Sequence, residues 1–204
     1  MKQKKMATTA SLFGAALASL LVAPELQADV VINNTGITDP AQTLTFSELS
    51  FETGTPITDQ FSGFGVTFSP SMFYNVQPLF FPTDFLASFD LQGTRNNVSI
   101  FFSQDVTGAA LALQSNPEDT TFTALYNGVV VETFTTLTQL SILPDLTHAS
   151  DFYGFENIVF DELRIENASE IFQIDNLQYT FVPGPFSGAL LGLAALCGTR
   201  RRRR

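Results

Sequence analysis

Cysteine, tryptophan and histidine are nearly absent from this chain of 204 residues, which has one cysteine, one histidine and no tryptophan. Cys197 lies close to the C-terminus, so the region before it holds no internal disulfide and must fold on core packing. A single histidine, His148, cannot build a zinc site of several histidines. The chain also lacks a Gly-x-Ser-x-Gly elbow and a dinucleotide fingerprint, so no familiar catalytic motif is present.

Positive charge is scarce in the middle of the chain. Between positions 29 and 181 the only cations are Arg95 and Arg164, whereas of the 20 carboxylates only Glu25 lies outside this stretch. Two arginines therefore face 19 carboxylates, and the formal charge of the stretch is about −17. Nucleic acid would be repelled, because its binding depends on Lys and Arg that neutralise phosphates.

The N-terminus has the three parts of a secretory signal. Three lysines within residues 2–5 precede an apolar stretch rich in Ala and Leu over residues 7–22, and Ala28 follows as a small residue at a cleavage position. This pattern predicts a signal peptide over residues 1–28, removed by signal peptidase after Ala28. The alternative is an N-terminal membrane anchor that is not cleaved.

The C-terminus has a second ordered pattern. Val182, Pro183, Gly184 and Pro185 interrupt the preceding strand pattern, residues 186–199 carry no charge, and the chain closes on a basic cluster of Arg200, Arg201, Arg202, Arg203 and Arg204. The apolar stretch is shorter than the ~20 residues that cross a bilayer, although flanking arginines can reach the interface. Because basic residues stay cytoplasmic, the domain before the tail is expected outside the cell.

This tail, residues 182–204, resembles the PEP-CTERM sorting signal that exosortases process. Gly184 stands where the Pro-Glu-Pro motif of that signal has its glutamate. The resemblance implies a protein exported by a Gram-negative bacterium, sorted at the membrane, and associated with extracellular polysaccharide and biofilm. An ordinary C-terminal membrane tail is the alternative.

Residues 29–181 show the alternation of β-strands rather than a helical period. Strands are expected near 44–46, 64–68, 98–102, 109–114, 158–165 and 171–180. Asn127-Gly128 between two β-prone runs predicts a type I′ hairpin. The 69–86 segment, interrupted by three prolines, is expected to be a long loop or a sheet edge. Short strands without a crossover helix predict an all-β antiparallel sandwich, with jelly-roll connectivity as our choice, flanked by an N-terminal signal helix and a C-terminal hydrophobic helix.

Two short stretches, residues 51–55 and 172–179, resemble the carbohydrate-binding-module type of jelly roll. In that family an early Glu and a late Asp share a structural calcium, so the resemblance implies Glu52 and Asp175 as ligands. Independently, the apolar parity of the last strand switches across Asp175-Asn176, which predicts a β-bulge there. Such a bulge exposes the carbonyl oxygens that calcium prefers. The alternative is an Asp175 that only caps backbone amides.

Three functions from different classes fit these observations. The first is a non-catalytic exported surface or matrix protein that needs no cofactor, with signal peptidase, an exosortase-type enzyme and the membrane as partners, and that binds or organises exopolysaccharide. The second is a structural or adhesive surface protein without a defined ligand. The third is a polysaccharide hydrolase, which would need two carboxyls ~5–10 Å apart in one cleft.

Overall fold

The computed structural model describes residues 28–76, 84–89, 96–138, 151–168 and 171–183. Every strand pairing within these residues is antiparallel, which confirms the all-β antiparallel class. The helices predicted at the two ends lie outside the described residues. Within the described part, no helix is long and apolar enough to cross a membrane.

The described elements are β1 (Asp29–Asn33), β2 (Gln42–Leu44), β3 (Pro56–Ile57), the 3-10 turn η1 (Ser62–Phe64), β4 (Val66–Ser69), β5 (Met72–Asn75), β6 (Phe85–Phe89), β7 (Asn96–Ser115), β8 (Glu118–Tyr126), β9 (Val129–Thr138), β10 (Phe152–Asn167) and β11 (Ile171–Phe181).

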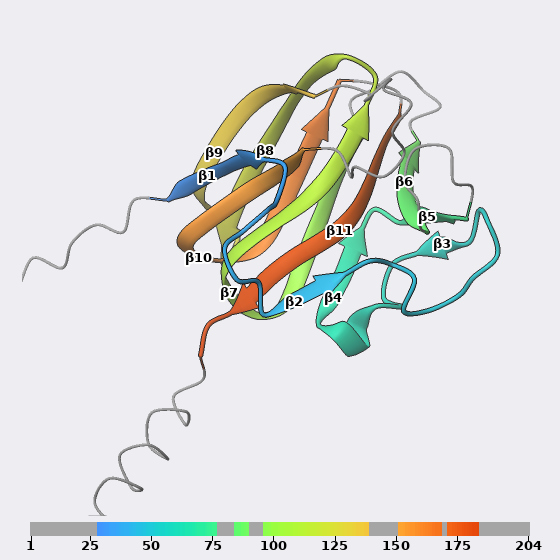
Figure 1. The fold of residues 1–204 in the computed structure, drawn as a ribbon, viewed down its shortest axis with the longest axis horizontal. Helices are drawn as coiled ribbons and strands as arrows, with labels where there is room; N and C mark the ends of the chain where they lie inside the picture. The colour runs from blue at the N-terminus through green and yellow to red at the C-terminus, as the bar shows by residue number, and fades with distance from the viewer. Residues whose placement is uncertain (1–27, 77–83, 90–95, 139–150, 169–170, 184–204) are drawn as a thin grey trace, which may run out of the picture.

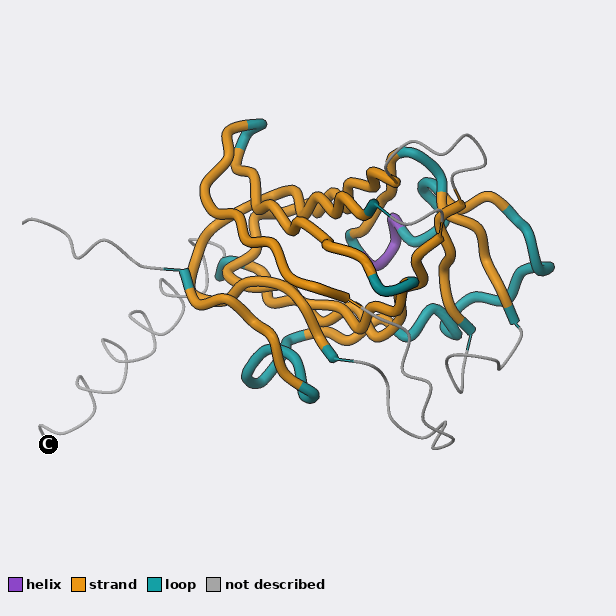
Figure 2. Tube along the Cα trace, turned by 90° about the horizontal axis from the view of Figure 1, so that it is seen from above, coloured by secondary structure: helices purple, strands orange, loops and turns teal. Residues whose placement is uncertain are grey.

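The strands form two layers because the two longest strands, β7 and β10, change layer along their length (Figures 1 and 2). The first layer has the order β4-β7-β10-β8-β9 and uses residues 96–102 of β7 with 162–167 of β10. The second layer has the order β1-β10-β7-β11-β6-β5-β3, with β2 also on β11, and uses residues 106–115 of β7 with 152–156 of β10. Register shifts mark the change in β10, where Asn157 has a φ of 59°. Strands that switch sheets at bulges close a sandwich in this way.

One apolar core fills the space between the layers, and aromatic rings bridge it. Phe122 of the first layer stacks on Tyr153 of the second with ring centroids 5.3 Å apart. Phe134 meets the edge of Phe155 at 5.2 Å. Such pairs add to the free energy of burying the rings. The sandwich arrangement that the alternation predicted is therefore present, while the jelly-roll connectivity stays a prediction.

The predicted hairpin is confirmed in detail. β8 and β9 are joined by Asn127 and Gly128, whose φ angles of 52° and 77° are both positive. A type I′ turn needs positive φ at both positions, which Asn and Gly tolerate best.

Two predicted strands have different limits in the structure. The strand expected over 44–46 ends at Leu44, because Phe46 takes a left-handed φ of 58° and its side chain is fully buried. The strand expected over 64–68 runs from Val66 to Ser69, since η1 and the left-handed Gly65 precede it. In both cases a buried ring or a tight turn overrides local alternation.

The proline-rich 69–86 segment contributes β5 and the start of β6 at the β3 end of the second layer. β5 lies between β3 and β6, and β6 lies between β5 and β11, so the prediction of a loop or sheet edge is wrong for these residues, and β3 is the edge strand. Pro70 precedes β5, so it does not interrupt the strand. Met72 and Tyr74 are fully buried, so these residues pack back onto the sandwich instead of facing solvent. Residues 77–83 lie outside the described part.

Candidate functional site

The outward face of the first layer carries a group of polar residues. In β7 the residues Val98, Ile100 and Phe102 point into the core, so Asn97, Ser99 and Phe101 point outward. In β10 the same alternation places Leu163 and Ile165 inside and puts three charged residues, Glu162, Arg164 and Glu166, outside. We call this surface the outer polar face.

The strand register aligns hydroxyl-bearing side chains in a row across this face. Ser69 of β4 lies opposite Ser99 of β7, which lies opposite Arg164 of β10. Arg164 in turn lies opposite Thr123 of β8, and Thr123 opposite Thr133 of β9. Side chains that are opposite in an antiparallel pair are close neighbours on one face. Five strands therefore contribute one residue each, four hydroxyls and the Arg164 guanidinium, to what we call the hydroxyl row. Ser69 and Thr133 are exposed in this row, whereas Ser99 and Thr123 are buried.

Glu162 is the centre of a compact polar network beside this row. Its Oε1 accepts hydrogen bonds from Ser99 Oγ at 2.6 Å, Arg164 Nη2 at 2.7 Å and Arg164 Nε at 3.1 Å. The Glu162 side chain is 8% exposed and that of Arg164 is 35% exposed. The guanidinium thus neutralises a buried carboxylate and presents its outer edge to solvent.

An aromatic ring flanks the network. Phe101 lies directly opposite Glu162 and is 39% exposed, although most aromatic rings among the described residues are buried. Cross-strand hydroxyl pairs continue the surface on the hairpin, where Thr121 and Thr135 are 2.8 Å apart and Thr123 and Thr133 are 3.1 Å apart. The outer polar face therefore combines an accessible apolar ring with fixed hydroxyls and one guanidinium.

This arrangement is suited to binding a polyhydroxylated ligand. Hydroxyls both donate and accept hydrogen bonds, and the guanidinium only donates, so the face can satisfy both kinds of group on a ligand. An exposed ring adds an apolar surface for stacking. Specific binding sites commonly pair such a ring with a few placed polar groups.

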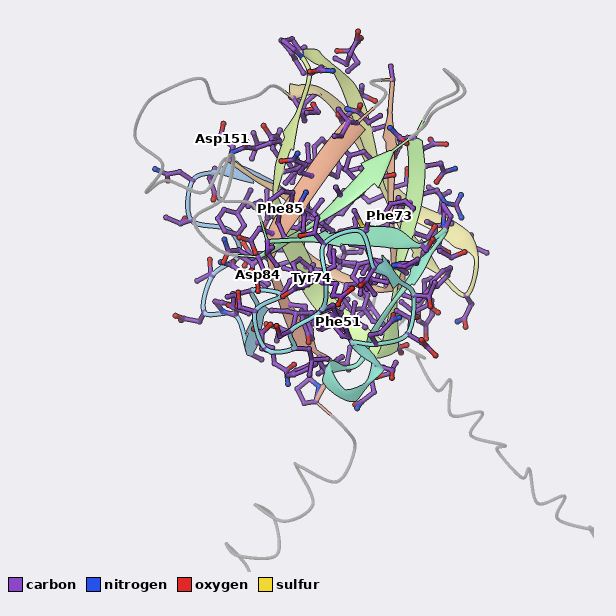
Figure 3. All side chains as sticks on the ribbon, turned by 90° about the vertical axis from the view of Figure 1, so that its right-hand side faces the viewer. Phe51, Phe73, Tyr74, Asp84, Phe85 and Asp151 are labelled. Atoms are coloured by element: carbon purple, nitrogen blue, oxygen red, sulfur yellow. The ribbon has the colours of Figure 1, made fainter. Side chains whose placement is uncertain are left out.

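A second polar feature lies at the β3 end of the second layer, where Figure 3 shows Tyr74, Asp84 and Phe51 close together. The Tyr74 hydroxyl donates to the Asp84 carboxylate and lies 3.0 Å from the Leu49 carbonyl oxygen. Burial of the phenol, followed by its hydrogen bond to Asp84, raises the pKa of Tyr74. Tyr74 is fully buried, so this feature ties together the chain around β5 and does not offer a binding surface.

The residues predicted for sorting fall at the limits of the described chain. Ala28 is half-buried and directly precedes β1. Val182 is half-buried, its amide donates to the Asp105 carbonyl at 2.8 Å, and Pro183 is exposed. The remaining predicted positions, Gly184, Pro185 and Arg200 to Arg204, lie outside the described residues, as does His148.

The predicted calcium ligands have different surroundings. Glu52 is exposed in the connection between β2 and β3, whereas Asp175 is fully buried in β11. Across the described part of the chain, no three His, Cys, Asp or Glu side chains gather as a metal site would require. Calcium binding stays a prediction, and thermal melts of the protein with and without a chelator test it.

The predicted bulge at Asp175-Asn176 is confirmed by a register shift between Asp175 and Gln178 and by the φ of 50° at Asn176. Asp175 Oδ1 accepts a hydrogen bond from the Asn176 amide at 2.6 Å. This contact matches the capping role that was the alternative to calcium.

Sequence reasoning missed the outer polar face, although one signal pointed to it. Arg164 is one of only two cations between positions 29 and 181, and it lies between Glu162 and Glu166 in an alternating strand pattern. That pattern places all three side chains on one face. The partners on β7 and β8 come from tertiary register and have no local signature.

No family model matches the chain, and no curated protein matches it. Two solved structures are similar to part of it. One is the structure of CBM32-3 from a family 31 glycoside hydrolase from Clostridium perfringens, with a TM-score of 0.32 and 9% identity over 48% of this chain and 75% of that one. The other is CpGH89CBM32-6 produced by Clostridium perfringens, with a TM-score of 0.30 and 12% identity over 47% of this chain and 76% of that one. At these TM-scores neither likeness carries an argument about ligand or activity.

Proposed function

We propose that this protein is a non-catalytic, exported bacterial surface or matrix protein that binds exopolysaccharide on its outer polar face. The observation that carries the proposal is the network of Ser99, Glu162 and Arg164 beside the exposed Phe101. It is the described place where a fixed guanidinium, hydroxyls and an accessible ring meet on one surface.

Geometry explains how this face would hold a sugar chain. A saccharide ring has apolar C–H groups on its faces and hydroxyls at its rim, so it needs a flat apolar partner beside directed polar groups. Phe101 supplies the first, and Arg164 and the exposed Thr133 of the hydroxyl row supply the second. Because Glu162 fixes the guanidinium in place, little side-chain entropy is lost when a ligand binds.

Affinity electrophoresis in gels containing soluble polysaccharide tests the binding proposal. The probes are a neutral xylan and an acidic alginate, and the purified full chain should be retarded by at least one. Phe101→Ala should weaken binding about tenfold, whereas Val159→Ala should not, and both native side chains are 39% exposed. If neither probe retards the protein, or if both variants weaken binding equally, the outer polar face is not the binding site.

Export and sorting form the second part of the proposal, and they rest on the sequence patterns at the two ends. We propose cleavage after Ala28, recognition of the tail from Val182 to Pro185 by an exosortase-type enzyme, and cytoplasmic retention of the Arg200–Arg204 cluster before processing. The mature protein would then reside at the cell envelope or in the extracellular matrix. Mass spectrometry of the protein recovered from its native cell is the test, because a mature chain that still ends at Arg204 would exclude processing of the tail.

A further inference from the structure

The first strand begins and the last strand ends at the same end of the sandwich. Asp29, the first residue of β1, lies opposite Glu156 of β10. Glu156 lies opposite Gly108 of β7, and Gly108 lies opposite Thr180 near the end of β11. Asp29 and Thr180 are therefore three strand spacings apart, or about 14 Å. We call this the bend end, because β7 and β10 change layer here (Figure 1).

The turn of the β8–β9 hairpin also lies at the bend end. The Tyr126 hydroxyl donates to Asp105 Oδ2 at 3.3 Å, and the Asp105 carbonyl accepts from the Val182 amide at 2.8 Å. The Asn127 amide lies 3.1 Å from both carboxylate oxygens of Asp161, in the bent part of β10. The hairpin turn is thus fixed beside the residues at which β11 ends.

Exposed apolar side chains gather at this end. Ten large hydrophobic residues of the described part are exposed, and five of them, which we call the end patch, belong to the hairpin tip or the bend of β10: Tyr126, Val129, Val130, Val131 and Val159. Val129 is the most exposed of the ten, at 66%. Apolar side chains exposed together at one place are typical of an interaction surface.

We propose that the end patch lies against a lipid surface while the chain is anchored in a membrane, an inference that rests on the membrane tail of the proposed function. Val182 is held on Asp105, and the uncharged stretch of the tail begins at Phe186. Four residues span at most about 14 Å, so a tail embedded in a bilayer keeps the bend end within that distance of it. A signal segment that stays in the membrane would hold Asp29 at the same end.

The chemistry of the end patch suits the lipid interface. Its valines are apolar, and its tyrosine has an apolar ring with a polar tip, like the tyrosines at the interfaces of membrane proteins. A few exposed valines bind lipid only weakly by themselves, but the tail makes the contact intramolecular and so raises the effective concentration of the surface. Asp29, Asp105 and Asp161 at this end repel anionic headgroups, so the surface we expect is zwitterionic.

Quenching from within the bilayer tests the contact. The full chain carries Cys197→Ser and either Val129→Cys or Leu137→Cys, is labelled with an environment-sensitive fluorophore, and is reconstituted into phosphatidylcholine vesicles that contain doxyl-labelled lipid. Both native residues are exposed on β9, at 66% and 57%, and about 26 Å of strand separates them. We expect quenching about twofold stronger or more at Val129→Cys, because side chains in the interface lie within about 10 Å of the acyl chains.

Val159→Asp separates contact from proximity. A carboxylate in the end patch should reduce the quenching at Val129→Cys to about the level at Leu137→Cys. Val76→Asp is the matched control, since it adds the same charge directly after β5 at a residue 46% exposed, and it should leave the quenching unchanged. Circular dichroism checks that each variant is folded.

Two results would overturn the inference alone. They are equal quenching at the two cysteines of the vesicle-bound, folded protein, and quenching at Val129→Cys that ignores Val159→Asp. A full chain that does not float with the vesicles would overturn the membrane tail of the proposed function together with the inference. Polysaccharide binding by the outer polar face is independent of each of these outcomes.

Discussion

The outward faces of the two layers are built from the same two strands, β7 and β10, yet they differ in almost every property. On the first layer, the outward residues of β7 are Asn97, Ser99 and Phe101, of which Asn97 and Phe101 are exposed and Ser99 is buried. On the second layer, its outward residues are Ala110, Ala112 and Gln114, and all three are buried. A strand that changes layer can thus serve two surfaces of opposite character.

The outward face of the second layer carries several small residues and is covered by other parts of the chain. Ala87, Ala110 and Ala112 belong to a separate buried cluster that also includes Ile37 from the connection between β1 and β2. Gln178 holds this connection through its Oε1, which accepts from the Ile37 amide at 2.9 Å, and its Nε2, which donates to the Thr35 carbonyl at 3.1 Å. The difference teaches that the same strands are covered by the connection between β1 and β2 on one layer and carry polar residues, some of them exposed, on the other.

The largest effect is expected from Gly154→Ala on the covered face. A methyl group at Gly154 would lie 2.0 Å from the Ala109 carbonyl oxygen and 2.6 Å from the Ala110 Cα, so β10 and β7 would have to separate. We expect a loss of about 3 kcal/mol or more in the free energy of unfolding, measured by urea denaturation. Gly63→Ala is the matched control, because its added methyl meets nothing within 4 Å. Equal stability of the two variants would mean that the faces do not differ in packing.

A smaller effect is expected on the outer polar face from Arg164→Met. The change leaves the buried Glu162 carboxylate with Ser99 as its remaining partner in the network. Since the guanidinium is 35% exposed, we expect a loss of only about 1–2 kcal/mol. Adding Glu162→Gln to Arg164→Met should restore most of the lost stability, because no uncompensated charge then remains. A double variant less stable than Arg164→Met would contradict this account.

Local chemistry explains which parts of the fold could be predicted. The Asn127-Gly128 turn and the bulge at Asp175-Asn176 depend on neighbouring residues, and the structure confirms both. By contrast, the stretches 98–102 and 109–114 were expected as separate strands, whereas they are two parts of the single bent strand β7. No local signal shows that a strand continues through a change of layer.

The outer polar face could not be predicted because its register is long-range. Ser99 and Glu162 are 63 residues apart, and they meet only because β7 and β10 pair at that register. Glu52 and Asp175, which a family resemblance implied, include one exposed and one buried residue. The alternation along a strand tells which of its residues share a face. It does not tell which residues of other strands lie beside them, because that depends on how the strands pair.

Tyr179 lies in the core between the two layers. Its hydroxyl donates to the Phe64 carbonyl at 2.6 Å, and burial, followed by the nearby charge of Glu48, raises its pKa to about 12. Because the pKa is higher in the folded protein, its stabilising contribution is complete below pH 10 and is lost as the pH rises through 12. Tyr179→Phe should lower stability by about 1 kcal/mol at pH 7 and should flatten the decline above pH 10. Tyr126→Phe, at a residue 37% exposed, is the control and should leave the stability at pH 7 nearly unchanged.

The smallest effect is expected from Thr121→Val with Thr135→Val on the outer polar face. These hydroxyls are 2.8 Å apart and partly exposed, so water can replace the lost hydrogen bond, and valine suits a strand. We expect unfolding free energy to change by less than about 0.5 kcal/mol. The reverse exchange on the covered face, Ala112→Thr, adds a hydroxyl where the native side chain is fully buried and should cost about 1–3 kcal/mol. If the two exchanges cost the same, the two outward faces would be equally packed at these positions, and the contrast between them would fail.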